Sequence, residues 1–211
     1  MKYTGMPSGM WHIFAGSFRK QLTTVFGYDT SAAKAITKKA KRKYKEILSN
    51  LPEFEKKDRF KVNIVSSAML AAFILNMPRR PDVERLTEYY AKAMMIPAMR
   101  WFCRQSGKQK FTEKEKASLK ATAALRAADR NPYSWNMDFK EYPDGSGYEA
   151  LFTKCGICTL MRDLGLYDLT PALCRFDYTM SEAGGAADFV RQCTLASGGP
   201  YCDCGYRQKK Y

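Results

Sequence analysis

The sequence predicts an α+β protein: about five N-terminal helices, then a small antiparallel β-sheet with two helices packed on it. Residues 1–130 are rich in Ala, Lys, Met, Leu and Glu, and their apolar residues recur every three or four positions, as in amphipathic helices. Beyond residue 130 the apolar period shortens to two and glycine-rich turns appear, which favours strands. Apolar residues make up 45% of the 211, enough for a substantial core.

The first part is predicted to hold five helices. The second begins at the N-cap oxygens of Asp29-Thr30-Ser31 and ends at Pro52, and Pro97 should kink the fourth. Residues 62–78 are uncharged but contain Asn and Ser and fall short of the ~20 apolar residues of a bilayer span, so we expect a buried helix and no membrane span. The predicted ranges are 9–26, 31–50, 60–77, 82–105 and 113–130.

The second part is predicted to open with a β-hairpin, because two alternating runs flank the turn-forming sequence Pro-Asp-Gly-Ser-Gly. Two helical runs and two further extended runs follow, with a Ser-Gly-Gly-Pro turn between the last two. We therefore expect two parts, a basic helical part over 1–130 and a cysteine-rich α+β part over 131–211, or one continuous domain. The hairpin strands are placed at 135–142 and 148–154, the helices at 156–164 and 170–183, and the extended runs at 187–195 and 201–208.

Positive charge is concentrated in the first part, where residues 1–130 hold 27 basic and 11 acidic side chains, against 8 and 10 in the remainder. The stretch densest in basic residues, 34–61, could bind phosphates or an anionic membrane surface. Its apolar residues recur at helical spacing, however, so the lysines are expected to form a solvated face, and nucleic acid is not expected as a partner. The stripe consists of Ala35, Ile36, Ala40, Tyr44, Ile47, Leu48 and Leu51.

Cysteine is concentrated in the second part, which holds six of the seven. The N-terminal stretch lacks the unbroken apolar region of a signal peptide, so we expect a cytoplasmic protein with reduced thiols that act as ligands, nucleophiles or packing groups. His12 is the only histidine, and a packed or capping role is expected for it. A histidine triad or a two-histidine zinc site is therefore unavailable to one chain.

Cys155-Gly-Ile-Cys158 stands where a strand gives way to a helix. Unpaired backbone N–H groups there favour a thiolate and also suit a metal-binding knuckle. Cys174 and Cys202 or Cys204 could complete a four-cysteine zinc or iron–sulfur site, although the spacing of two matched C-x-x-C pairs is missing. The alternative for Cys158 and Cys193 is burial as small hydrophobic residues.

Two further segments carry polar chemistry. Cys174-Arg-Phe-Asp177 puts a thiol and a carboxylate three residues apart on one helical face, where they can share a ligand or a proton. Gly198 and Gly199 lie where the backbone can approach a ligand, or where the chain reverses direction.

In their order, these motifs resemble one known family, the L-2-amino-thiazoline-4-carboxylic acid hydrolases. The resemblance spans about 148–206: a cysteine that opens a helix, then Cys-x-x-Asp, then Arg-x-x-Thr-Leu, then Gly-Gly-x-x-Cys-Asp. Gly156 stands where members often have proline and Cys204 where the pattern favours phenylalanine, and neither departure falls on a residue with a proposed polar role.

The resemblance implies a hydrolase that opens a small amino-acid-derived heterocycle, 2-amino-thiazoline-4-carboxylate, to a carbamoyl-cysteine. The alternative is a non-enzymatic cysteine-rich module that binds a metal, an iron–sulfur cluster or a small ligand. A homo-oligomer is left open. The implied catalytic residues are Cys155, Cys174, Asp177 and Cys202, the substrate-binding residues are Arg191, Thr194, Gly198 and Gly199, and the candidate metal ligands are Cys155, Cys158, Cys174 and Cys202.

Overall fold

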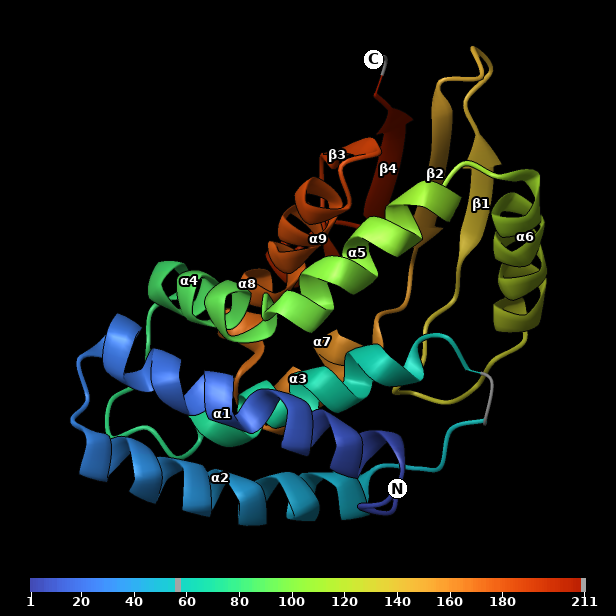
Figure 1. Ribbon diagram of the computed structural model, residues 1–211. Coiled ribbons are helices and arrows are strands. Elements are labelled where there is room, and N and C mark those ends of the chain that lie inside the picture. Colours follow the sequence, from blue (N-terminus) through green and yellow to red (C-terminus); the bar gives the residue numbers. More distant parts are fainter. Residues whose placement is uncertain (56–57, 210–211) are drawn as a thin grey trace. The chain divides into compact units, whose positions relative to one another are not determined.

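In the part of the chain that the structure describes, six helices precede a four-stranded antiparallel sheet, which confirms the predicted α+β class (Figure 1). The structure is a computed structural model and describes residues 1–55 and 58–209. The chain forms two compact units, each assembled from two stretches of sequence. We call Met1–Ile96 with Ile157–Leu173 the helical unit, and Pro97–Gly156 with the described residues from Cys174 onward the sheet unit.

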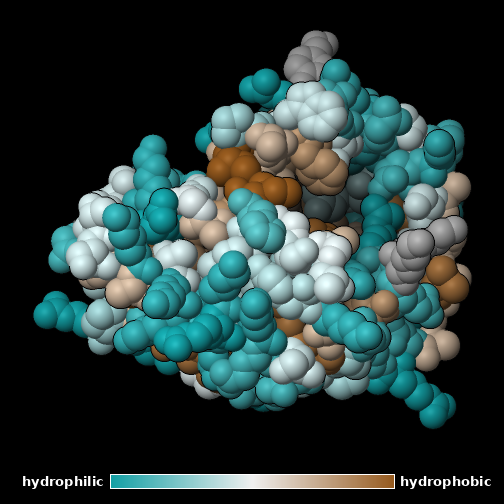
Figure 2. All heavy atoms as spheres, turned by 60° about the horizontal axis from the view of Figure 1, so that its bottom comes forward, coloured by the Kyte–Doolittle hydropathy of each residue, from teal (hydrophilic) through white to brown (hydrophobic). Residues whose placement is uncertain are grey.

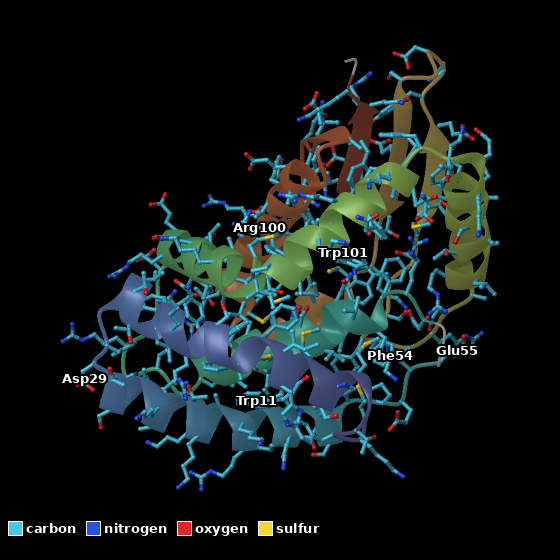
Figure 3. The ribbon with its side chains drawn as sticks, in the orientation of Figure 1. Trp11, Asp29, Phe54, Glu55, Arg100 and Trp101 are labelled. Carbon is cyan, nitrogen blue, oxygen red and sulfur yellow. The ribbon has the colours of Figure 1, made fainter. Side chains whose placement is uncertain are left out.

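The helical unit is built on α1, α2, α3 and α4. Asp29 caps α2 as predicted, accepting a hydrogen bond from the Ala32 N–H at 2.8 Å (Figure 3). Short helical segments from the second stretch complete the unit. The elements are α1 (Met6–Phe26), α2 (Thr30–Asn50), α3 (Lys61–Ile74), α4 (Val83–Met94), α7 (Gly156–Asp163, from Ile157 on), the 3-10 helix η1 (Tyr167–Leu169) and α8 (Thr170–Cys174, up to Leu173).

The core of the helical unit is aromatic and centres on α3, whose residues from Ile64 to Ile74 are all buried, as expected for the uncharged run. Trp11 of α1 stacks between Tyr44 of α2 and Phe73 of α3, with ring centroids 5.7 Å away on each side (Figure 3). Such ring pairs add to the stabilisation that comes from area burial alone. Within the described part of the chain, no helix has both the length and the apolar character needed to cross a bilayer.

Within α2, the basic stretch is confirmed as a solvated helix face with one correction, and its residues 56–57 lie outside the described residues. The buried residues of α2 include Ala33, whereas Ala35, which the prediction put in the apolar stripe, is exposed. Ala33 is three residues before Ile36 and continues the inward-facing row at the helical period. The lysines occupy the outer side of α2, and Figure 2, which turns that side of the molecule forward, is largely hydrophilic there.

The predicted fourth helix, 82–105, is wrong as one element. α4 ends at Met94, and a new helix, α5 (Pro97–Gln109), begins with Pro97 as its first residue. Proline in a helix interior loses a hydrogen bond and its ring clashes with the preceding turn, but at the first helical position it has neither cost. Pro97 therefore starts a helix and does not kink one, and it is also where the sheet unit begins.

The sheet unit consists of a four-stranded sheet in the order β1-β2-β4-β3, all pairs antiparallel, with α5, α6 and α9 as its helices. The predicted hairpin is β1–β2, although β1 is shorter than expected. α5 packs on α9, and α6 packs on β1. The elements are α6 (Glu113–Ala127), β1 (Asp138–Glu141), β2 (Gly147–Phe152), α9 (Phe176–Gly184), β3 (Ala187–Val190), the 3-10 helix η2 (Leu195–Ser197) and β4 (Cys202–Gln208).

The two faces of the sheet differ in character. Side chains alternate along a strand, and directly paired residues of antiparallel strands share a face. The apolar face packs toward α9, as the contact between Tyr178 of α9 and Phe189 of β3 shows, with ring centroids 4.7 Å apart. It carries Phe139, Tyr148, Ala150, Phe152, Phe189, Cys202, Cys204 and Tyr206, whereas the opposite face carries Asp138, Lys140, Glu149, Asp188, Asp203 and Arg207.

Two more predicted elements differ from the structure: one is divided and one ends early. The predicted helix 170–183 is divided into α8 and α9 at Arg175, which keeps helical dihedrals (φ −65°, ψ −20°). The extended run 187–195 ends at Val190, because the backbone N–H groups of Gln192 and Cys193 donate to the Asp203 carboxylate instead of to a strand partner.

Candidate active site

The candidate site lies at the Cys202 end of the apolar sheet face, within the sheet unit. Cys202 and Cys204 are two residues apart on β4, so both point to that face, beside Phe152 and Ala150 of β2. The start of α9 brings Asp177, and the segment after β3 brings Arg191. We call Cys174, Asp177, Arg191, Cys202 and Cys204 the thiol–carboxylate cluster.

Arg191 is the centre of the cluster and its side chain is only 6% exposed. One terminal nitrogen donates to the Cys174 carbonyl at 3.0 Å, and the other contacts Asp177 Oδ2 at 2.5 Å and Cys204 Sγ at 3.0 Å. The guanidinium also lies 4.6 Å from the ring centroid of Phe189. Arg191 Nε is buried without a hydrogen-bond partner. The guanidinium therefore holds the carboxylate and one thiol in place.

Burial raises the pKa of the Asp177 carboxyl above its ordinary value, although the positive charges of Arg191 and Lys110 partly oppose this. The side chain is still one-third exposed, so protons and small molecules can reach it. A carboxyl group with a raised pKa in contact with solvent can hold and release a proton closer to neutral pH than an ordinary aspartate does.

The thiols of the cluster have raised pKa values. Burial raises the pKa of Cys174, and the nearby Asp177 charge raises it further. Burial also raises the pKa of Cys202, while the Leu195 N–H, which donates to its sulfur at 3.2 Å, lowers it. Burial raises the pKa of Cys204 to about 12 even though Arg191 opposes the shift. These three sulfurs are therefore thiols and weak nucleophiles at neutral pH.

Cys155 stands between β2 and the first residue of α7, at the strand-to-helix junction that the sequence predicted. It is partly exposed, and its charge in the thiolate form raises the pKa of both Cys174 and Cys202. Cys155 thus lies within electrostatic reach of the cluster, and it is more accessible than Cys202 or Cys204.

Asp203, next to two cluster cysteines, points to the opposite sheet face. Its two carboxylate oxygens accept hydrogen bonds from the Gln192 and Cys193 N–H groups, each at 2.7 Å. Burial alone would raise the pKa of Asp203, but these donors hold it below the ordinary value. The carboxylate thereby anchors the segment that carries Arg191.

The predicted substrate-binding residues other than Arg191 form a tight turn. The Thr194 hydroxyl accepts from the Ser197 N–H at 3.1 Å and caps η2, and Gly199 N–H donates to the Thr194 carbonyl at 2.9 Å. Gly198 ends η2 with φ +82°, a conformation that favours glycine. The turn orients Leu195, whose N–H contacts Cys202; substrate contact by these residues stays a prediction.

The structure brings Cys155, Cys174, Asp177, Arg191 and Cys202 into the sheet unit, and it leaves two other singled-out residues in the helical unit. Cys158 is buried there, as the hydrophobic alternative expected. His12 is exposed, with a ring nitrogen 2.7 Å from the Ser8 carbonyl. Among residues 1–55 and 58–209, no three Cys, His, Asp or Glu side chains are grouped as metal ligands would be. The four-cysteine metal site stays a prediction.

Three residues contribute to the site in ways that the sequence did not predict. Cys204, which the sequence offered only as an alternative metal ligand, contacts Arg191. Tyr206 and Cys204 share the face of Cys202, and the two-residue period of β4 could have revealed both. Lys110 of the α5–α6 connection has its Nζ 3.5 Å from the ring centroid of Tyr206, and no local pattern links residues so far apart.

The fold and this cluster define an α+β protein whose candidate site combines thiols, an arginine and one carboxyl group. Residues 62–206 match the family model of L-2-amino-thiazoline-4-carboxylic acid hydrolase. The match covers more than half of the chain, so the chain belongs to that hydrolase family, and the predicted resemblance is confirmed. A search of curated proteins and a search of solved structures found no match.

Proposed function

We propose that this chain hydrolyses the ring of a small amino-acid-derived heterocycle, with 2-amino-thiazoline-4-carboxylate as the candidate substrate. The observation that carries the proposal is the Arg191–Asp177 pair, set among thiols on one sheet face. The family name supports a hydrolase, and the cluster supplies a carboxyl group able to carry a proton.

The ring carbon bonded to sulfur and two nitrogens is electrophilic, and its hydrolysis needs a nucleophile and an acid. In the proposed route Cys155 Sγ adds to this carbon and Asp177 protonates the departing ring atom, so that the ring opens. Water then adds to the carbon and gives a proton to Asp177, and the Cys155 sulfur leaves. The product is a carbamoyl-cysteine, one water is consumed, and no oxidant or reductant is needed.

The environments of the thiols favour different roles for them. Cys155 is favoured as nucleophile because Cys174 and Cys202 are held protonated, which weakens them. Arg191 keeps Asp177 and Cys204 in place. A direct contact between Arg191 and the substrate carboxylate, which the family resemblance implies, would use the unpaired Nε.

The first test incubates the purified protein with 2-amino-thiazoline-4-carboxylate in ¹⁸O-labelled water. We expect a ring-opened product that carries one labelled oxygen. Replacing Asp177 by Asn should lower turnover by about 10²–10⁴-fold, since an amide cannot carry the proton. Asp188→Asn, an exposed strand residue 3.5 Å from Lys209, is the matched control and should keep full turnover.

The outcome that contradicts the proposal is the absence of ring opening by folded protein across thiazolines, imidazolines and cyclic ureas. Full turnover by Asp177→Asn would contradict the role of Asp177 and leave it as a structural partner of Arg191.

A further inference from the structure

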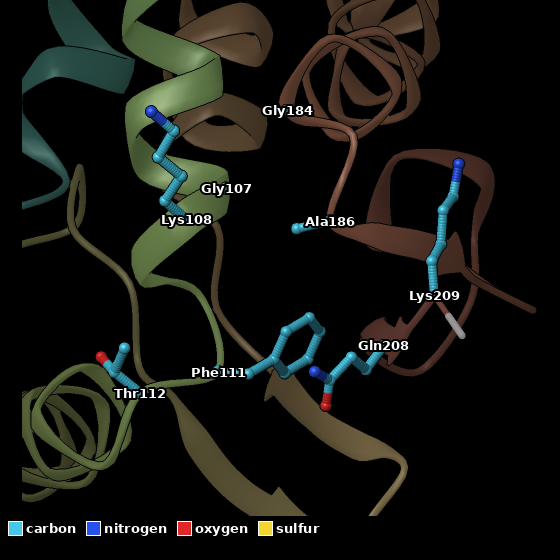
Figure 4. A pocket seen from close by; sticks show the side chains of 8 residues that line it. All are labelled: Gly107, Lys108, Phe111, Thr112, Gly184, Ala186, Gln208 and Lys209. Atoms are coloured by element: carbon cyan, nitrogen blue, oxygen red, sulfur yellow. The ribbon is translucent and has the colours of Figure 1, made fainter. Parts of the chain in front are cut away.

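The contact between α5 and α9 is unusually close because it is made by glycines. A Cβ atom on Gly107 would lie 2.4 Å from the Gly184 carbonyl oxygen, and one on Gly184 would lie 3.2 Å from the Cys103 carbonyl oxygen. Figure 4 shows the two glycines where these helices approach each other. Backbone-to-backbone contact fixes the position of α5 against α9, the helix that carries Asp177.

Lys110 follows Gly107 by three residues, just past the end of α5, and its backbone N–H donates to the Gly107 carbonyl at 3.1 Å. Its Nζ lies 3.5 Å from the ring centroid of Tyr206. That ring is held by two neighbours on the same sheet face, Phe189 at 5.1 Å and Tyr148 at 5.4 Å between centroids. A cation over a packed aromatic ring is attracted to it, so the ammonium group is held in one place.

The titratable groups around Asp177 come from every element packed against it. Tyr206 and the cluster thiols stay neutral at neutral pH, because burial raises the pKa of each. Arg191 and Lys110 are then the charges that the carboxyl group experiences. The surrounding groups are Lys110 from the end of α5, Cys174 from α8, Arg191 after β3, and Cys202, Cys204 and Tyr206 from β4.

We propose that Lys110 is a positioning residue of the candidate site: docked on Tyr206, on the sheet face that carries Cys202 and Cys204, it adds its positive charge to that of Arg191 around Asp177. Arg191 touches Asp177, whereas Lys110 acts on it through space. The catalytic consequence of this inference rests on the proposed function, but the electrostatic effect itself does not.

The test follows the Asp177 carboxyl group directly, by ¹³C NMR titration of protein labelled at aspartate Cγ. The Asp177 signal is identified by its loss in Asp177→Asn. Replacing Lys110 by Met removes the charge and keeps the length, so the Asp177 titration should move to higher pH. Lys110→Arg should restore it. Lys110→Gln serves as a second neutral variant if the methionine variant does not fold.

Lys108→Met is the matched control. Lys108 is on the same helix, it is exposed, and in Figure 4 its side chain points away from α9. The change in net charge is identical, so an effect of net charge alone would appear equally in both variants. The inference is overturned if Lys110→Met moves the Asp177 titration no further than Lys108→Met does, or if Lys110→Arg behaves like the neutral variants.

Activity gives the second readout. Because Asp177 acts first as an acid, the alkaline limb of the kcat/KM profile, where Asp177 loses its proton, should move to higher pH in Lys110→Met by the same amount as the NMR titration. A loss through KM alone, with an unmoved pH profile, would contradict a role exerted through Asp177. If the titration moves as expected but no heterocycle is opened, the electrostatic inference stands and the proposed function fails.

Discussion

Asp177 and Asp203 are two aspartates of the sheet unit whose pKa values move in opposite directions. Burial raises the pKa of Asp177, with one arginine in contact. Two backbone N–H groups lower the pKa of Asp203 and overcome its burial. Hydrogen bonds to the charged form favour ionisation, and desolvation opposes it. We infer that Asp177 can exchange protons, while Asp203 is a permanent anion that holds the Arg191 segment.

The Asp203 anchor predicts an acid-dependent loss of stability. A carboxyl group whose folded pKa lies below its unfolded value of 3.8 stabilises the fold above that value, and the contribution is lost as the pH falls through the folded pKa. Asp203→Asn should cost about 1.5–3 kcal/mol at neutral pH, the range for hydrogen bonds to charged groups, and should flatten this dependence below about pH 4. Urea unfolding from about pH 2.5 to 7 measures both.

Asp188→Asn, on the neighbouring strand and exposed, is the control for that experiment and should change stability little. An Asp203→Asn protein with unchanged stability at neutral pH would show that the Gln192 and Cys193 hydrogen bonds do not anchor the segment.

Cysteine reactivity should separate Cys155 from the other thiols. Cys155 is partly exposed at a strand-to-helix junction and is expected to be alkylated fastest near neutral pH. Cys193 is also partly exposed, but burial and the nearby Asp203 charge raise its pKa, so it is the matched comparison. Mass spectrometry that resolves each cysteine should find Cys155 labelled first, turnover lost in parallel, and protection by substrate.

A chelator arm tests the metal prediction in the same experiment. If Cys155 were a metal ligand, its labelling would be slow until the chelator removed the metal. If Cys155 stays unlabelled with and without chelator, it is an unreactive thiol, and both roles are contradicted.

At the scale of elements, the α5–α9 contact should tolerate no side chain. Gly107→Ala puts a Cβ atom 2.4 Å from a backbone oxygen, so the helices must separate, at a cost of about 1–3 kcal/mol. Gly16→Ala in α1 is the matched control: nothing lies within 4 Å of the position that its Cβ atom would take, and it should stabilise by about 0.5–1 kcal/mol. Denaturant unfolding compares the two, and equal effects would contradict a tight contact.

Most elements could be predicted because their signals are local. The Asp29 cap, the uncharged run of α3 and the glycine-rich hairpin turn each act within a few residues. The predicted end of β3 was wrong because a distant group decides it, whereas at Pro97 a local signal was assigned the wrong role. β3 ends early because the Asp203 carboxylate accepts hydrogen bonds from the Gln192 and Cys193 N–H groups. The alternation of residues 187–195 does not reveal these bonds.

At the scale of the whole molecule, the order of the motifs along the chain was enough to predict part of the site. Cys155, Cys174, Asp177 and Arg191 were selected from their order and spacing, and the sheet unit brings them together. Lys110 was not selected from the sequence, because its position over Tyr206 follows from the packing of α5 on α9. Tertiary contacts of this kind leave no periodic signal in the chain.

The net charge of +14 leads to the last prediction, which concerns binding to polyanions. The apolar side of α2 is buried, so its lysines are displayed on a solvated face without groups arranged to recognise bases. Such a face attracts phosphates through counterion release alone. We expect binding of duplex DNA or anionic vesicles at about 50 mM salt that is lost near about 200 mM, without sequence preference. Fluorescence anisotropy over a salt series measures this, and replacing Lys38, Lys39 and Lys45 by Glu should abolish the low-salt binding and leave turnover unchanged. Binding that survives about 200 mM salt, or that prefers one sequence, would mean that α2 forms a specific interface and would contradict the expectation that nucleic acid is not a partner.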